Sequence, residues 1–181
     1  MIIWIASYPK SGNTWIRTFL TAYYFCENGI FDINKLNHIQ DYPNKQFFKN
    51  KVKDGEIHKH WDESQKAIVS ERKIKFLKTH NSLITAFGND FTIPKYSLGV
   101  IYIIRDPRNV VLSYARHLKI SIEETVKFMT KGKANDMFLM GNWAENFVSW
   151  KQFSNYNNYL LIKYEDLVSK REETFIQILQ F

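Results

Sequence analysis

The segment best suited to chemistry runs from Tyr8 to Trp15 and reads Y-P-K-S-G-N-T-W. It follows an apolar run at 2–6 that predicts a buried strand, and it precedes a helical pattern that reaches about Cys26. A glycine between a strand and a helix lets backbone N–H groups approach a phosphate, and the helix N-terminus adds about half a positive charge. Lys10 adds a full charge. The pattern favours a phosphate-binding loop over an ordinary strand-to-helix turn, although it lacks the G-x-x-x-x-G-K-S/T order of a nucleotide P-loop.

A second pair of chemically useful residues, Lys78 and His80, stands at the end of the run 74–78, which predicts another strand. Their spacing of two residues puts both side chains on the same side of the chain. The pKa of histidine lies near neutral pH, so a histidine that faces a cleft can act as a general base. A single histidine in such a place is more often a solvated loop residue, and this prediction therefore depends on what lies beside it.

The third candidate is Arg105, which follows the predicted strand 100–104 and precedes an Asp-Pro pair typical of a helix start. A guanidinium at such a place can bind an anion through parallel hydrogen bonds. Ser113, two turns into the helix, reaches the same anion if the helix packs across the site. The alternative for Arg105 is an ion pair with Asp106 or Glu165.

An α/β fold would bring these segments together, because ligands bind where the carboxyl ends of parallel strands share one edge of a sheet. We expect a three-layer α/β/α domain with a central parallel sheet. Thr14 is expected to cap the first helix, and Asp106 a helix that reaches about His117. The other expected elements are a strand at 159–164, helices at 122–130, 143–153 and from 168 or 171 onward, and short helices and loops over 27–66.

The composition narrows the functional classes. The chain has 181 residues, of which 45% are hydrophobic and 24% charged, the size and make-up of about one globular domain. Its single cysteine, Cys26, excludes a disulfide framework and a cysteine-based zinc site. The net charge of +7 favours an anionic partner, but no nucleic-acid-binding motif accompanies it, so we expect no nucleic acid. No membrane-spanning run and no signal peptide is evident, so we expect a cytoplasmic protein.

Four segments together resemble the cytosolic-type sulfotransferases. Tyr8–Trp15 is similar to their 5′-phosphosulfate loop, whose usual form is Y-P-K-S-G-T-T-W, and Lys78-Thr79-His80 resembles their K-T-H segment. The segment 101–114 resembles their 3′-phosphate segment, in which a serine follows an arginine by eight residues, as Ser113 follows Arg105. The segment 162–167, I-K-Y-E-D-L, is similar to their Y-E-D-M/L segment. The four occur in the family's order and span nearly the whole chain.

The resemblance implies a P-loop nucleotide-kinase-like α/β fold and a transferase. Its donor would be 3′-phosphoadenosine 5′-phosphosulfate (PAPS) and its product 3′-phosphoadenosine 5′-phosphate (PAP). The acceptor would be a hydroxyl or amine of a small molecule, lipid or carbohydrate, and no metal is required. The resemblance implies His80 as the general base, Lys10 at the leaving oxygen and Lys78 at the transferring group. The donor-binding residues that it implies are Lys10, Ser11, Gly12, Asn13 and Thr14 at the 5′-phosphate, Trp15 and Tyr164 at adenine, and Arg105 and Ser113 at the 3′-phosphate.

Two departures from the family pattern affect these expectations. Asn13 stands where the family usually has threonine, which keeps a hydrogen-bond donor. The family's C-terminal R-K-G-x-x-G segment, which closes over the 3′-phosphate, has no counterpart before Phe181. We therefore expect residues 1–181 to form a single sulfotransferase-like domain without that segment, with weaker donor binding and an oligomeric state that the sequence does not reveal.

Two other functions stay open at this point. A kinase or NTPase of related fold would use ATP and Mg²⁺, with Asp106 as the candidate magnesium ligand. A catalytically inactive domain would bind PAP or PAPS without turnover. The acceptor is not identified by the sequence. Its expected lining is the segments 27–66 and 81–97, in which the candidate apolar residues are Phe47, Phe48, Trp61 and Phe87.

Overall fold

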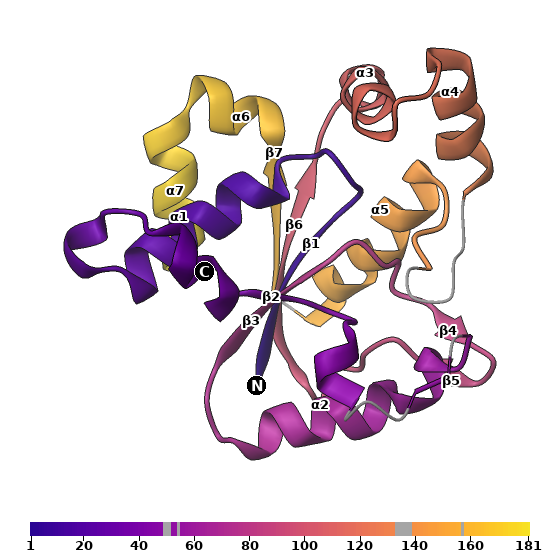
Figure 1. Cartoon of the computed structure of the whole chain (residues 1–181). Coiled ribbons are helices and arrows are strands. Elements are labelled where there is room, and N and C mark those ends of the chain that lie inside the picture. Colours follow the sequence, from indigo (N-terminus) through magenta and orange to yellow (C-terminus); the bar gives the residue numbers. More distant parts are fainter. Residues whose placement is uncertain (49–51, 54, 133–138, 157) are drawn as a thin grey trace.

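The centre of the protein is a five-stranded sheet (Figure 1). The computed structural model describes residues 1–48, 52–53, 55–132, 139–156 and 158–181. Neighbouring strands in this sheet are all parallel, in the order β2-β3-β1-β6-β7. The strands are β1 (Ile2–Ser7), β2 (Gln40–Asp41), β3 (Lys75–Thr79), β6 (Ser97–Ile104) and β7 (Tyr159–Lys163). A small antiparallel pair lies apart from them, formed by β4 (Thr85–Ala86) and β5 (Asn89–Asp90).

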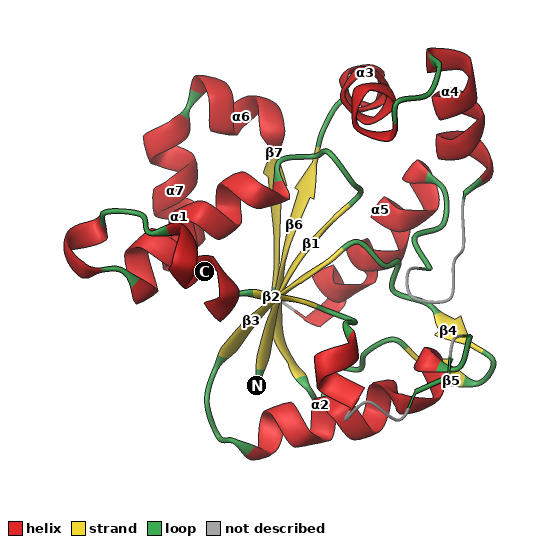
Figure 2. Cartoon of the chain, viewed as in Figure 1, coloured by secondary structure: helices red, strands yellow, loops and turns green. Residues whose placement is uncertain are grey.

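Helices cover both faces of the sheet, which confirms the predicted three layers (Figure 2). The helices α1, α6 and α7 lie on one side, and α2 and α5 lie on the other, with α3 and α4 beyond the ends of β1 and β6. Their bounds are α1 (Asn13–Phe25), α2 (Trp61–Ser70), α3 (Pro107–Leu118), α4 (Ile122–Lys131), α5 (Trp143–Lys151), α6 (Tyr164–Ser169) and α7 (Arg171–Gln180). Short 3-10 helices occur at 27–29, 33–38, 45–48, 57–60 and 152–156. Within the described residues, no helix combines the length and apolarity needed to cross a membrane.

Alternate side chains of β1 enter different layers of the core. The ring of Trp4 lies 5.4 Å from that of Phe91 and 6.1 Å from that of Trp150, centroid to centroid, on the face that α2 and α5 cover. The next residue, Ile5, packs with Ile16 of α1 on the opposite face. Because both faces are buried, β1 has an unbroken apolar sequence, and this is why the sequence alone identified it as a strand.

The structure corrects the local sequence predictions at two places. Helix α1 begins at Asn13, so the capping position belongs to Gly12, which has a φ of 103° and no side chain to cap with; Thr14 lies inside the first turn. The edge strand β2 was not predicted, since two residues give no periodicity. The cap of α3 is as predicted, because the side chain of Asp106 accepts a hydrogen bond from the backbone N–H of Arg108.

The strand order decides where a ligand can bind. Strand β1 lies between β3 and β6. The chain places β3 on one side of β1 and then crosses over to place β6 on the other side. Parallel sheets bind ligands at such a switch point, outside the carboxyl ends of the strands. The segments that follow β1, β3, β6 and β7 therefore meet at one edge, and these are the four segments that carry the sequence motifs.

Candidate functional site

A cavity of about 650 Å³ lies at the carboxyl ends of these strands. It brings together the predicted site residues from four separate segments, with the exception of Ser11. The hydroxyl of Ser11 is fully buried in the loop beside the cavity and has no hydrogen-bond partner among the described residues. The lining consists of Pro9, Lys10, Gly12, Asn13, Thr14, Trp15, Lys78, His80, Arg105, Ser113, Tyr114, His117, Leu118, Met140 and Tyr164. It contains three cationic side chains and no carboxylate.

The loop after β1 is shaped by two residues with left-handed backbone. Lys10 has a φ of 66° and Gly12 a φ of 103°. A Cβ on Gly12 would lie 2.6 Å from Cδ2 of Tyr164, so glycine is required here both for its backbone conformation and for the close approach of that ring. Backbone of this kind suits a concave arrangement of N–H groups, and the first N–H groups of α1 have no acceptor within the helix.

The side chain of Asn13 is engaged inside the protein. Its Nδ2 donates hydrogen bonds to the carbonyl of Ile5, at 3.0 Å, and to Oγ of Ser7, at 3.1 Å. Both amide hydrogens are used in this way, and the remaining Oδ1 can only accept. The side chain of Asn13 therefore fixes the loop to the end of β1. The donor that the sequence analysis expected from this side chain is not free.

Arg105 is held by two contacts at the wall of the cavity. Its Nη1 donates to the carbonyl of Lys10, at 3.1 Å, and its guanidinium carbon lies 4.0 Å from the centroid of the Tyr164 ring. The alternative ion pairs are not formed: Asp106 pairs with Arg108, and Oε1 of Glu165 accepts from the backbone N–H of Asp106. Asp106, the candidate magnesium ligand of the kinase hypothesis, does not line the cavity, and Arg108 holds its pKa near 2.

His80 has a defined tautomer. Its Nδ1 lies 2.7 Å from the carbonyl oxygen of Ser7, and because a carbonyl only accepts, Nδ1 carries the proton. The other nitrogen, Nε2, has no partner among the described residues and keeps its lone pair. Burial of the ring, reinforced by the positive charge of Lys78, lowers the pKa of His80 to about 3. The imidazole is therefore neutral at physiological pH. The ring lines the cavity, and its Nε2 is available to accept a proton.

Several lining residues were missed by sequence reasoning. His117 lies one turn beyond Ser113 on α3, and this i, i+4 spacing could have identified it. Met140 and Leu118 give the cavity an apolar side, and no motif marks them. The four aromatic residues expected at the acceptor do not line this cavity: Phe48 and Trp61 belong to the core, Phe47 packs against it, and Phe87 is 87% exposed.

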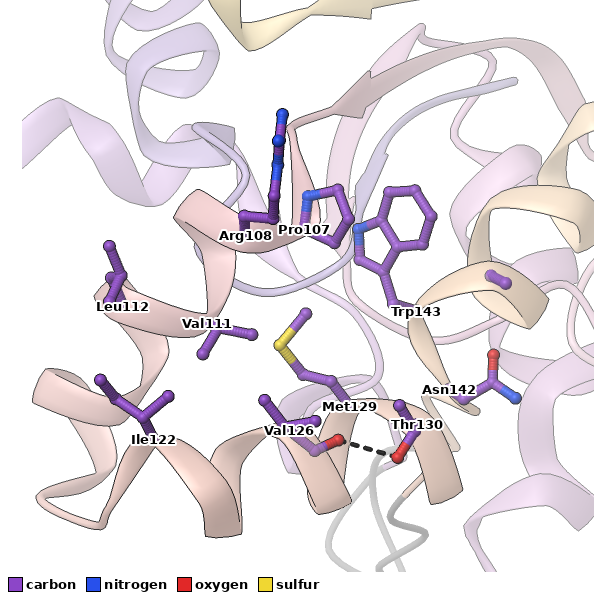
Figure 3. Close-up of a pocket in the computed structure, with 11 residues that line it drawn as sticks. Pro107, Arg108, Val111, Leu112, Ile122, Val126, Met129, Thr130, Asn142 and Trp143 are labelled. Carbon is purple, nitrogen blue, oxygen red and sulfur yellow. Dashed lines mark hydrogen bonds between the residues drawn. The ribbon is translucent and has the colours of Figure 1, made fainter.

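A second hollow, of about 700 Å³, lies between α3, α4 and α5 (Figure 3). Its surface is made largely of apolar side chains, among them Val111, Val126 and Met129. Two of its polar side chains are paired within the protein, since Thr130 donates to the carbonyl of Val126 and Arg108 pairs with Asp106. This hollow therefore lacks the three cationic side chains that distinguish the cavity at the strand ends.

Comparison with known proteins decides the family. A family model described as the sulfotransferase domain matches residues 2–181. The chain belongs to the sulfotransferase-domain family. Among curated sulfotransferases, Sulfotransferase 2A6 of Mus musculus and Sulfotransferase 2A1 of Homo sapiens are each 26% identical to this chain, over 98% of its length. This sulfotransferase-family chain spans only 57% of either relative.

Solved structures show the same fold for this sulfotransferase-family chain. Mouse sulfotransferase SULT7A1 complexed with PAP matches 99% of the chain with a TM-score of 0.56 at 18% identity, over 55% of its own length. Retinol dehydratase, in complex with androsterone and the inactive cofactor PAP, matches 98% of the chain with a TM-score of 0.60 at 16% identity, over 58% of its own length. The predicted P-loop-type α/β fold is thus confirmed. Within the described residues, no cluster of three or more histidine, cysteine or carboxylate side chains could hold a metal ion.

Proposed function

We propose that this chain carries the donor site and the catalytic residues of a sulfotransferase, which moves a sulfuryl group from PAPS to the hydroxyl or amine of a small-molecule acceptor. The observation that carries the proposal is the lining of the cavity at the strand ends. Lys10, Lys78 and Arg105 come from three different strand ends and surround one volume that no carboxylate lines. A cavity of this charge suits a ligand with several anionic groups.

The donor fits the cavity at both of its phosphate ends. Lys10 and the start of α1 suit the 5′-phosphosulfate, and Arg105 with Ser113 suits the 3′-phosphate. Two buried polar atoms next to these places, Oγ of Ser11 and Nε of Arg105, have no partner among the described residues. Since buried polar groups are normally hydrogen-bonded, they support an anionic ligand here.

Two aromatic residues suit the adenine. The ring of Trp15 lies 6.0 Å from that of Tyr164, nearly perpendicular to it, and both line the cavity. A base can stack on one such face while the other ring borders its edge, and base–aromatic stacking contributes about 1–3 kcal/mol.

Sulfuryl transfer is an in-line displacement, in which the S–O bond to the donor phosphate breaks as the S–O bond to the acceptor forms. Nε2 of His80 takes the proton from the acceptor hydroxyl, because Nδ1 is committed to the carbonyl of Ser7. The Lys10 ammonium stabilises the charge that develops on the leaving oxygen, and that of Lys78 stabilises the transferring group. The anionic donor raises the low pKa of His80, which makes the imidazole a stronger base when the donor is present.

The acceptor is proposed to enter beside His80, over the apolar side of the cavity formed by Leu118 and Met140. These side chains suit an apolar small molecule that carries a hydroxyl. One solved relative of the same fold contains androsterone, a molecule of that chemical class.

The proposal is tested by calorimetric titration with PAP and with Mg-ATP, followed by transfer from ³⁵S-labelled PAPS to a panel of phenols, steroid alcohols and amines. We expect binding of PAP in preference to Mg-ATP, and label on at least one acceptor. The variant His80→Ala should retain PAP binding within about threefold and lose transfer by about 10²–10⁴-fold. A preference for Mg-ATP would refute the proposal, while binding of PAP without transfer would support the catalytically inactive domain.

A further inference from the structure

Asp41 lies on the edge strand β2, directly beside Lys78 of β3. Its carboxylate Oδ2 is 3.1 Å from Nζ of Lys78, and its Oδ1 is 3.3 Å from Nη1 of Arg17 on α1. We infer that Asp41 is a positioning residue, which holds the ammonium of Lys78 charged and directed at the wall of the donor cavity. This inference rests on the proposed function for its catalytic consequence, but its electrostatic content can be measured without any donor.

The backbone fixes Asp41 in register with Lys78. The two residues are paired across the parallel strands β2 and β3, and the N–H of Tyr42 donates to the carbonyl of Lys78 at 2.7 Å. The amide of Asn44 donates to the carbonyl of Asp41 at 2.6 Å. Both bonds hold the peptide group that joins Asp41 to Tyr42, so the carboxylate extends from main chain that is fixed directly beside it.

Arg17 fixes the carboxylate from the other direction. Its Nη2 donates to the carbonyl of Ile39, at 2.7 Å, while its Nη1 faces Asp41. The guanidinium therefore bridges the backbone before β2 and the side chain at its end. Asp41 is shared between two cations, and its orientation toward Lys78 is set by contacts from α1, β2 and β3 together.

The charge on Lys78 depends on this carboxylate. The side chains of Lys78 and Arg17 are only 13% and 14% exposed, whereas that of Asp41 is 43% exposed. Burial lowers the pKa of Lys78, and Asp41 opposes that change. The other charged or titratable groups that act on it are Arg17 from α1, which lowers its pKa further, and His80 from the segment after β3.

The position of Asp41 outside the lining has a functional consequence. It supplies the counter-charge to Lys78 from behind the cavity wall, so no carboxylate faces the anionic donor. A lysine side chain has a flexible four-carbon stem, and a fixed partner reduces the orientations open to its ammonium. Without Asp41, two buried cations would face each other and Lys78 would release its proton more readily.

The test is a pH titration of the Lys78 ammonium by NMR on lysine-labelled protein, in wild type and in two variants. Asp41→Asn keeps the shape of the side chain and removes its charge, and it should lower the pKa of Lys78 by one unit or more, since an opposite charge at this distance shifts a pKa by about 1–3 units. Arg17→Gln removes the competing cation and should raise the pKa of Lys78. A purely structural role for Asp41 would leave the pKa of Lys78 unchanged in Asp41→Asn.

The matched control is Glu71→Gln, which removes the carboxylate partner of Lys75. That ion pair, at 2.7 Å, lies on the surface with side chains 35% and 48% exposed, and its removal should leave the titration of Lys78 as it is in the wild type. In assays with PAPS, Asp41→Asn should lose at least tenfold in kcat with a smaller change in KM, its alkaline limb should move to lower pH, and Asp41→Glu should recover part of the loss.

Unchanged titration of Lys78 in folded Asp41→Asn would overturn the inference, whether or not the protein transfers sulfate. If Asp41→Asn does not fold, the same titration on Asp41→Ser decides, and an unchanged pKa of Lys78 there overturns the inference as well. Absence of transfer by the wild type with the expected shifts present would instead count against the proposed function only.

Discussion

The guanidinium carbon of Arg105 lies 4.0 Å above the ring of Tyr164, which in turn lies against Gly12. Arg105 also donates to the carbonyl of Lys10. One side chain from the end of β6 is thus joined to the loop after β1 and, through a ring, to the start of α6. These contacts connect the two proposed phosphate ends of the site. A substitution at one end should therefore alter the side-chain positions at the other end.

Substitution of Arg105 should weaken PAP binding. Arg105→Ala removes a charged donor, and we expect a loss of about 10- to 100-fold in affinity, the equivalent of about 1.5–3 kcal/mol for such a hydrogen bond. Arg105→Lys should recover little, because an ammonium cannot both cover the Tyr164 ring and bind in a bidentate manner. Calorimetry with PAP measures both. The control is Arg116→Ala, which removes an equal charge from the exposed part of α3 and should leave the affinity for PAP within about twofold. Equal losses of affinity in Arg105→Ala and Arg116→Ala would contradict a specific role for Arg105.

Gly12→Ala should lower the free energy of unfolding for two reasons that can be measured separately. The φ of 103° is unfavourable for alanine, and its Cβ would lie 2.6 Å from Cδ2 of Tyr164. Gly88 is the matched control, since its φ is 78° and no atom lies within 4 Å of an added Cβ. Urea unfolding should show a loss of about 1–2 kcal/mol for Gly88→Ala and at least about 1 kcal/mol more for Gly12→Ala. Adding Tyr164→Ala should return part of that difference, and its failure to do so would argue against the clash.

Substitution of Asn13 should reduce the free energy of unfolding more than it reduces the affinity for PAP. Asn13→Ala leaves the carbonyl of Ile5 and the hydroxyl of Ser7 without their donor, which should lower the free energy of unfolding by about 1–3 kcal/mol. PAP affinity, measured where both proteins are folded, should fall less than for Arg105→Ala. A larger fall in affinity than in stability would mean that the Asn13 side chain turns to the phosphate when the donor binds.

The pKa of His80 should respond to the donor. In the free protein the imidazole should show no titration by NMR above pH 5, because its pKa is about 3. Bound PAP places negative charge near the ring and should raise that pKa by one unit or more. A midpoint for His80 near 6.5 in the free protein, the value for an unperturbed histidine, would show that the buried neutral state is wrong.

The same low pKa makes folding stability depend on pH. The unfolded chain binds a proton at this histidine with a pKa of about 6.5, whereas the folded chain does so only near pH 3. Stability should therefore be fully present above pH 6.5 and fall as the pH decreases toward 3, with a slope of up to about 1.4 kcal/mol per pH unit from this one group. Between pH 6.5 and 5, where carboxylates remain ionised, urea unfolding of His80→Gln should lack that slope. Parallel curves for the two proteins would remove His80 as the cause.

The sequence by itself determined the fold class and the main strands and helices. The buried parallel strand β1 is apolar from Ile2 to Ala6, and the Asp-Pro pair at the start of α3 marks a helix start by local chemistry alone. The motif residues Lys10, Lys78, His80 and Arg105 could also be named, because they follow strands directly and topology then places them at one edge.

Only the tertiary structure decided how these residues are used. The tautomer of His80 depends on the carbonyl of Ser7, which lies 73 positions away in the sequence, and the charge on Lys78 depends on Asp41, on a strand of two residues. The amide of Asn13 is engaged inside the loop by the carbonyl of Ile5, a partner that its residue type did not indicate. Hydrogen-bond partners, burial and the resulting pKa values arise from contacts between segments that are distant in the sequence. Residue type and spacing do not indicate which segments make these contacts.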